Sequence, residues 1–329
     1  MKTWIFWLDV VKFLAICLVV LAHVIWAVES SAYNGVSHEF LTIHRILGSL
    51  GVPLFMMVSG ALLFGKKFES KRDIFQFYKK GLLPLMISAW IWIALYCILQ
   101  LKPFSIKELL LCMTFVHKPE VHLWYVRLIL LYYLAIPYIN LLRSKCSVAF
   151  YALLAVIGAF TFIYNGWLIY QGVSCPTSSS RSYFCYLIYM AVGYWLSRVS
   201  ISRTRISLIV IIAVLGGHVL YKSLMDSSYF LWYDNPMIAI IAFCIFYLLR
   251  AFFVQSQSKS CIVEISKMTY GIYLSHFILI YVASYFMKNA NWSIGIFYLT
   301  WMMVLLVDVL WLWLMKRCSC KVSKVIHRY

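Results

Sequence analysis

The sequence predicts an all-α, polytopic membrane protein with about ten transmembrane helices and no soluble domain. Of its 329 residues, 64% are hydrophobic and only 12% are charged, and the mean hydropathy is +0.86. A soluble domain is about half apolar and roughly one quarter charged, so this composition excludes one. It also excludes intrinsic disorder, which requires few apolar residues and many charges. At ~20 residues per span, ten spans account for the hydrophobic fraction.

Ten apolar runs are long enough to predict transmembrane helices. They cover residues 5–28, 41–64, 82–100, 122–142, 148–170, 183–198, 205–222, 235–254, 262–287 and 293–315. The segment 105–116 is also apolar but short, and a re-entrant or interfacial position is the alternative to a further span. The run 5–28 is long for a cleavable signal peptide and is interrupted by Asp9 and Lys12, so we interpret it as a retained helix.

The basic residues predict how these spans are oriented. The net charge is +18, from 29 Lys and Arg against 11 Asp and Glu. One set of alternate connecting segments holds 19 of these cations and the other holds seven, which places both termini in the cytoplasm by the positive-inside rule. Residues 1–315 then form a membrane domain, and 316–329 form a basic cytoplasmic tail. Because the charges lie in the connections between spans, we expect membrane lipid and no nucleic acid as a partner.

The ten cysteines predict neither a disulfide framework nor a metal site. Five of them, namely Cys17, Cys97, Cys112, Cys185 and Cys244, lie in or beside apolar runs, where cysteine behaves as a small apolar side chain. Cys318 and Cys320 form a C-x-C without a second ligand pair, and the histidines are scattered without ligand spacing, so no metal is expected. Cys175 and Cys185 could approach one another across a loop, which the sequence leaves open.

Ionisable side chains inside the predicted spans indicate a polar interior. The first span holds Asp9, Lys12 and His23. His23 follows Lys12 by 11 positions, so at ~100° per residue both lie on one face of a helix, roughly 16 Å apart along its axis. Asp9 shares that face and can pair with Lys12. Snorkelling to the surface explains Lys12 equally well, and a hydrogen bond to a neighbouring helix is the alternative for His23.

Further deep polar groups occur in later spans. His122 and Arg127 lie in the fourth predicted span, and His276 lies near the middle of the ninth, with Tyr273 on its face. Each alone is explained by a structural hydrogen bond, but together they predict a polar cavity. The motifs of soluble enzymes, including the P-loop, GxGxxG, HExxH and GxSxG, are absent. Ser59-Gly60 is therefore not a nucleophile elbow, and Gly60 is expected to allow close helix packing.

Four ordered motifs resemble the acyltransferase-3 family of integral-membrane O-acyltransferases. They are WLDVVKFLAICLVVLAHV (7–24), VPLFMMVSGALLFGKK (52–67), HLWYVRLILLYYLAIPYI (122–139) and SKMTYGIYLSHFILI (266–280). The first resembles the family's pattern of an Arg and a His with ten residues between them. The set is most similar to the branch that acetylates enterobacterial surface polysaccharides such as the enterobacterial common antigen. Lys12 departs from the family's usual Arg, which keeps the charge but loses the bidentate fork.

The resemblance implies a bacterial inner-membrane enzyme. Its co-substrate is cytoplasmic acetyl-CoA, with no permanently bound cofactor, and its acceptor is a hydroxyl of a surface polysaccharide or of its lipid-linked precursor. A neutral His23 would accept the hydroxyl proton or the acyl group itself, with Lys12 and Asp9 assigned to the same catalytic group. Donor-side candidates are Lys79, Lys80 and Ser59. Acceptor-side candidates are His122, Trp124, Tyr125, Arg127, Tyr273 and His276.

Two other interpretations remain open at this stage. The six cations of segment 65–81 suit CoA phosphates, but the positive-inside rule can explain all of them. A transporter or lipid-linked glycan flippase would also have ten or more helices and a polar interior, although such proteins often contain repeats and none is apparent here.

Overall fold

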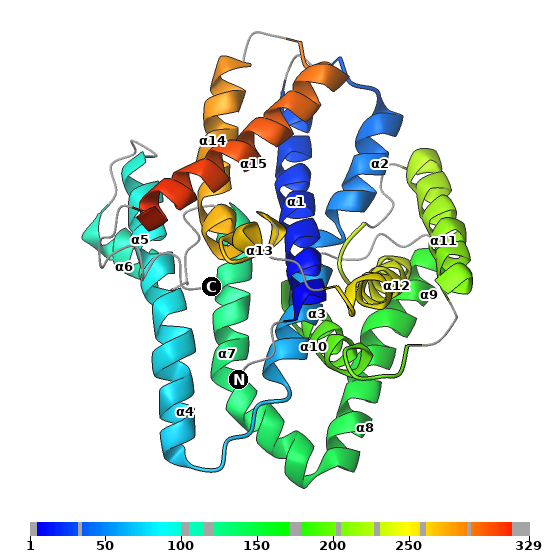
Figure 1. Ribbon diagram of the computed structural model, residues 1–329. Coiled ribbons are helices and arrows are strands. Elements are labelled where there is room, and N and C mark those ends of the chain that lie inside the picture. The colour runs from blue at the N-terminus through cyan, green and yellow to red at the C-terminus, as the bar shows by residue number, and fades with distance from the viewer. Residues whose placement is uncertain are drawn as a thin grey trace.

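The computed structural model describes residues 5–31, 35–99, 105–114, 121–171, 179–201, 205–226, 231–256, 261–287 and 291–317. Within these ranges the regular structure is helical (Figure 1). In chain order the elements are α1 (Phe6–Glu29), α2 (His38–Gly48), α3 (Gly51–Leu63), α4 (Lys71–Phe77), η1 (Tyr78–Leu82), α5 (Leu83–Leu99), α6 (Ile106–Met113), η2 (Val121–Leu123), α7 (Trp124–Lys145), α8 (Ser147–Gly158), η3 (Ala159–Ile163), α9 (Tyr164–Tyr170), α10 (Ser179–Leu196), α11 (Arg205–Met225), α12 (Pro236–Phe253), α13 (Cys261–Ser266), α14 (Thr269–Phe286) and α15 (Ile294–Arg317).

The apolar helices agree with the ten predicted spans. In the described part of the chain, nine helical stretches are long and apolar enough to cross a membrane, and the shorter apolar stretch Tyr183–Leu196 corresponds to the predicted span 183–198. Three of the nine are compound. Helices α2 and α3 together form His38–Leu63, α4, η1 and α5 form Lys71–Leu99, and α8, η3 and α9 form Ser147–Tyr170. The all-helical, polytopic fold is therefore confirmed.

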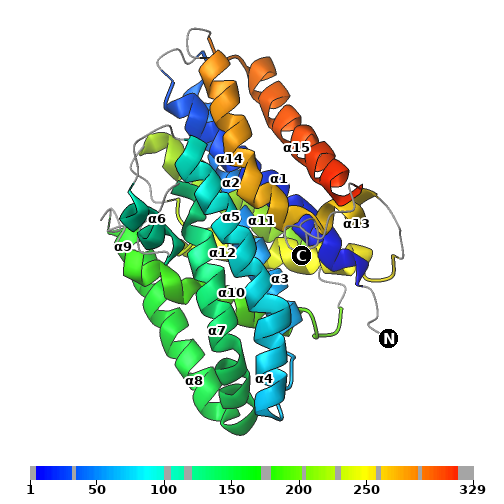
Figure 2. The ribbon, with the colours of Figure 1, turned by 90° about the vertical axis from the view of Figure 1, so that its left-hand side faces the viewer.

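Helix α1 lies at the centre of the molecule. It contacts α2, α3, α12, α13, α14 and α15. Figure 1 shows it between α14 and α2, and Figure 2 shows α14 and α15 beside it. Apolar residues surround most of its circumference, as the buried Val11, Ile16 and Val20 indicate. A helix that is apolar all round is enclosed by protein or by lipid, and the neighbouring helices bury Asp9 of α1 in protein.

Close packing of α3 on α10 depends on two glycines. A Cβ atom on Gly60 would lie 1.9 Å from the carbonyl oxygen of Met190, and one on Gly193 would lie 2.2 Å from the carbonyl oxygen of Met57. Small residues allow helix backbones to approach closely inside membranes, where van der Waals contact drives association. The predicted packing role of Gly60 is therefore confirmed.

The basic segment after α3 differs from the loop predicted over 65–81. From Lys71 onward it is helical and continues through η1 into α5, giving one stretch of 29 residues. The cause is a capping box, in which the Ser70 side chain accepts from the Asp73 backbone N–H and the Asp73 carboxylate accepts from the Ser70 N–H. The prediction of a loop is wrong beyond residue 70, because the Ser70-x-x-Asp73 pattern starts a helix despite the high charge of the segment.

The short helix α6 occupies part of the segment 105–116. Its eight residues extend only ~12 Å, which is too short to span a membrane. The Trp90 indole N–H donates to the Met113 carbonyl oxygen over 2.8 Å and holds the end of α6 against α5. The approach of Cys175 to Cys185, which the sequence leaves open, lies partly outside the described residues, since only Cys185, a buried cysteine in α10, is among them.

Candidate active site

Three histidines from distant parts of the sequence meet in the interior. His23 comes from α1, His122 from η2 and His276 from α14. The ring centroids lie 4.9 Å apart for His23 and His276, 5.2 Å for His122 and His276, and 6.1 Å for His23 and His122. His122 and His276 are fully buried, whereas His23 is half-buried. We call these three residues the histidine cluster.

The hydrogen bonds of the cluster fix the tautomers of two rings. His23 Nδ1 lies 2.9 Å from the Val19 carbonyl oxygen, and His276 Nδ1 lies 3.0 Å from the Ile272 carbonyl oxygen. Because a carbonyl oxygen only accepts, both Nδ1 atoms carry the hydrogen in the neutral rings. His276 Nε2 then accepts from His23 Nδ1, which is 3.1 Å away. This assignment leaves the lone pair of His23 Nε2 available to a substrate.

His122 differs from the other two rings. It stacks on Phe277 with a centroid distance of 4.6 Å, and neither of its ring nitrogens has a hydrogen-bond partner among the described residues. It precedes the apolar span that begins at Trp124. His122 is thus positioned by ring packing on Phe277 and His276.

A cavity of about 680 Å³ lies beside the first half of α1. Its polar lining includes Asp9, Lys12, Ser59 and Lys66, and its walls come from α1, α3, α5, α7, α13 and α14. Lys12 Nζ lies 3.2 Å from Asp9 Oδ1, as the sequence predicts. Asp9 also accepts a hydrogen bond from the Ser266 hydroxyl, so the carboxylate is fixed and the ammonium group is oriented by it. We call this space the inner cavity.

Two tyrosines separate the inner cavity from the histidine cluster. Tyr125 and Tyr273 both line the cavity, with ring centroids 5.3 Å apart. On its other side Tyr273 donates to the His122 carbonyl oxygen, and its ring lies 5.8 Å from that of His276. His23 does not itself line the inner cavity. One layer of side chains therefore stands between the cavity and the rings that can perform proton transfer.

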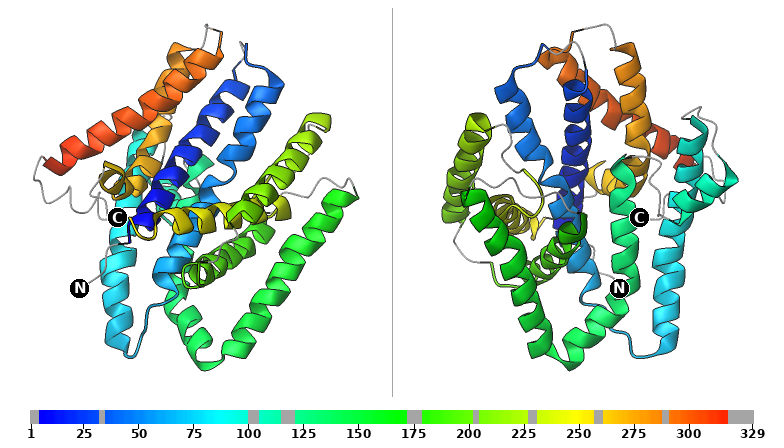
Figure 3. Two further views of the ribbon diagram at one scale, coloured as in Figure 1. Left: turned by 45° about the vertical axis from the view of Figure 1, so that its right-hand side comes forward. Right: turned by 180° about the vertical axis from the view of Figure 1, so that it is seen from behind.

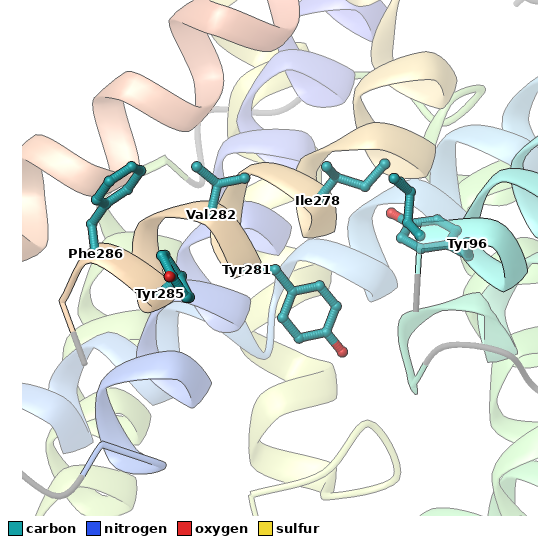
Figure 4. A pocket seen from close by; sticks show the side chains of 7 residues that line it. Tyr96, Ile278, Tyr281, Val282, Tyr285 and Phe286 are labelled. Atoms are coloured by element: carbon teal, nitrogen blue, oxygen red, sulfur yellow. The ribbon is translucent and has the colours of Figure 1, made fainter. Parts of the chain in front are cut away.

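A second space lies beyond the cluster, between the ends of α5 and α14. Its volume is about 530 Å³ and it is lined by Tyr96, Leu99, Ile278, Tyr281, Val282, Tyr285 and Phe286. Figure 4 shows these tyrosines and Phe286 arranged along one side of α14, with Tyr96 opposite. The Tyr96 ring lies 5.3 Å from that of His122, and its hydroxyl donates to the Leu274 carbonyl oxygen over 2.8 Å. We call this apolar, aromatic space the outer groove.

The three parts follow one another along α14, which lines the inner cavity with Tyr273, carries His276 of the cluster and lines the outer groove from Ile278 onward. The sequence pattern that defines the acyltransferase domain matches residues 5–312 and thus includes all three parts. The chain belongs to the acyltransferase-3 family. Comparisons with curated proteins and with solved structures gave no match.

Membership of this family makes the chain a membrane acyltransferase, and the predicted site residues can be located on that basis. The structure brings His23, His122 and His276 together, and it places Asp9, Lys12, Ser59, Tyr125 and Tyr273 around the inner cavity. The predicted acceptor-side residues Trp124 and Arg127 lie apart from the cluster. Trp124 stacks on Tyr233, and Arg127 donates to the Tyr183 hydroxyl.

Two predicted donor-side residues do not reach the inner cavity. Lys79 and Lys80 are exposed on η1 and do not line it. Their role in donor binding stays a prediction. Lys66 and Tyr270, which do line the cavity, were not predicted. Lys66 follows Gly60 of the Ser59-Gly60 pair by six residues. It was not singled out because the positive-inside rule explains every basic residue of segment 65–81.

Proposed function

We propose that this acyltransferase moves an acetyl group from acetyl-CoA on the cytoplasmic side to a hydroxyl of a surface polysaccharide or its lipid-linked precursor in the bacterial inner membrane. The observation that carries the proposal is the position of His23. Its Nδ1–H is held by Val19 and His276, so its Nε2 lone pair is directed away from both. A base oriented in this way is what the deprotonation of an alcohol requires.

The reaction follows from the chemistry of the groups. The acceptor hydroxyl oxygen attacks the thioester carbonyl carbon while its proton passes to His23 Nε2. The carbon–sulfur bond then breaks, and the CoA thiolate takes the proton back as the ester is released. With an acyl-histidine intermediate the same overall reaction takes two steps. His23 Nε2 first attacks the thioester carbonyl carbon and releases CoA, and the acceptor hydroxyl then takes the acyl group from the ring. The proximity of His276 supports either route, because its Nε2 accepts from the Nδ1–H of His23 and stabilises the positive charge that develops on that ring.

The inner cavity supports the donor assignment. It lies at the end of α1 that the distribution of basic residues places toward the cytoplasm. Lys12 is held in place by Asp9 as a point cation, which suits a carbonyl or amide oxygen of the pantetheine arm. The outer groove supports a lipid-linked acceptor, because an apolar space beside the cluster suits a lipid chain whose attached sugar reaches His23. We therefore propose that the chain belongs to the branch of the family that acetylates enterobacterial surface polysaccharides.

Donor dependence tests the proposal against a flippase or transporter. The purified protein in lipid nanodiscs is given acetyl-CoA with and without lipid-linked glycan extracted from cells that lack the gene. We expect free CoA thiol to appear only when donor and acceptor are both present, and the glycan to gain the mass of one acetyl group per modified sugar. Absence of thiol release, with glycan mass unchanged, would contradict acyl transfer to this acceptor class.

A further inference from the structure

Two arginines from different helices share one aromatic ring at the basic end of the molecule. The guanidinium carbon of Arg143, at the end of α7, lies 5.0 Å from the Tyr194 ring centroid, and that of Arg198 lies 3.7 Å from it. Arg198 Nη1 also donates to the Tyr194 carbonyl oxygen and to the Ser197 hydroxyl, over 3.0 and 2.8 Å. Both cations are thus fixed on the surface of α10. We call Arg143 and Arg198 the arginine pair.

No carboxylate compensates these two charges in the described part of the chain. The ion pairs found there are Lys12–Asp9, Arg45–Glu29 and Lys267–Glu264, none of which involves the arginine pair. Arg143 is half-buried, and its Nε is a buried donor without a hydrogen-bond partner. Two uncompensated cations that share one ring repel one another, and a buried unsatisfied donor is costly. An anion bound at Arg143 Nε would satisfy this donor and lower the local positive charge.

The arginine pair lies next to the inner cavity. A Cβ atom on Gly65 would lie 2.6 Å from Arg198 Nη2, so this guanidinium packs directly on the backbone that precedes the cavity-lining Lys66. The same backbone is bound to α7, because Asn140 Nδ2 donates to the carbonyl oxygens of Leu63 and Lys66 over 2.9 and 3.0 Å. Asn140 is three residues before Arg143 and therefore on the same face of α7. Lys66 thus connects the pair to the cavity.

We propose that the arginine pair binds the phosphate groups of the donor's nucleotide, while the pantetheine arm passes Lys66 into the inner cavity toward Lys12. This inference rests on the proposed acetyl-CoA donor and names the part of the protein that holds it. Arginine suits the task because its planar fork binds phosphate oxygens in pairs. The positive-inside rule explains why the two residues are positively charged. It does not explain why both guanidinium groups are held on one ring beside a cavity.

Binding of CoA to the purified protein in nanodiscs of zwitterionic lipid tests the inference. For Arg143→Gln/Arg198→Gln we expect the Kd for CoA to rise at least tenfold. The matched control Lys145→Gln/Arg205→Gln removes the same charge from two exposed basic positions outside segment 65–81, and its Kd should change less than twofold. With acetyl-pantetheine, a donor without the nucleotide, the double arginine variant should transfer acetyl at the wild-type rate, which also shows that it is folded.

The outcomes separate the possible failures. If the two double variants bind CoA with equal affinity, and the wild-type protein is active with acetyl-CoA, the phosphate site is overturned and the proposed function stands. A wild type that neither binds CoA nor releases it would instead remove the proposed function. A repeat in nanodiscs containing phosphatidylglycerol distinguishes the source of the phosphate. If the arginine substitutions weaken retention of this lipid but not of CoA, the pair is a lipid-headgroup site and the inference is wrong.

Discussion

At the scale of single residues, the chemistry depends on how one imidazole is held. Without its hydrogen bonds to Val19 and His276, His23 could adopt either tautomer, and only one of them presents a basic Nε2. His276 is in turn fixed by the Ile272 carbonyl oxygen and by its full burial. His276 is therefore a positioning residue in this account, and His23 is the residue that contacts substrate.

Substitution of His276 should separate these roles. His276→Ala removes the acceptor for His23 Nδ1–H, and we expect kcat to fall about 10–100-fold, the range typical of lost orienting partners, with the KM for acetyl-CoA unchanged. His276→Gln offers an amide oxygen as acceptor and should recover part of kcat. Steady-state kinetics on both variants provides the measurement. Wild-type kcat in His276→Ala, or no recovery in His276→Gln, would contradict a positioning role.

At the scale of elements, close backbone contacts place the site. The cavity lining contributed by α3, including Ser59, lies beside Gly60, where α3 meets α10 without space for a side chain. The arginine pair spans α7 and α10 next to the same contact. Separation of α3 from α10 would therefore disturb the wall of the inner cavity and the Tyr194 platform together.

A matched pair of glycines tests this packing. Gly193→Ala places a methyl group against the Met57 backbone, whereas Gly216→Ala in α11 meets no atom within 4 Å. Both positions are inside helices, where alanine is intrinsically better than glycine by about 1 kcal/mol. We expect Gly216→Ala to unfold at the same or a slightly higher temperature, and Gly193→Ala to lose several degrees and activity. Thermal unfolding of the detergent-solubilised proteins would contradict the account if the two variants behaved alike.

At the scale of the whole molecule, the inner cavity, the histidine cluster and the outer groove follow α14 from one end to the other. The basic end, with the loop after α3 and the junction of α7 and α8, lies at the bottom of Figure 1, whereas the ends of α1 and α14 lie at the top. Both views of Figure 3 keep this order. The arginine pair and inner cavity thus precede the histidine cluster, and the outer groove follows it. Donor and acceptor would meet in the middle.

The sequence predicts the helices far better than it predicts the site. Apolar runs identify the spans because burial in lipid demands them, and the spacing of Lys12 and His23 follows from helix geometry alone. The meeting of His23 with His122 and His276 is non-local, since 253 residues separate His23 from His276, and periodicity carries no information about such contacts. The sequence also does not single out Arg143 as a candidate phosphate ligand, because the positive-inside rule explains any basic residue on the cytoplasmic side.

The most direct test of the central claim is the rate of acetyl transfer by His23→Ala, measured at equal membrane abundance to the wild type. General base catalysis contributes about 10²–10⁴-fold, and we expect a loss in this range while CoA still binds with wild-type affinity through the separate inner cavity. A variant that transfers acetyl groups at an undiminished rate would contradict the assignment of His23 as the base.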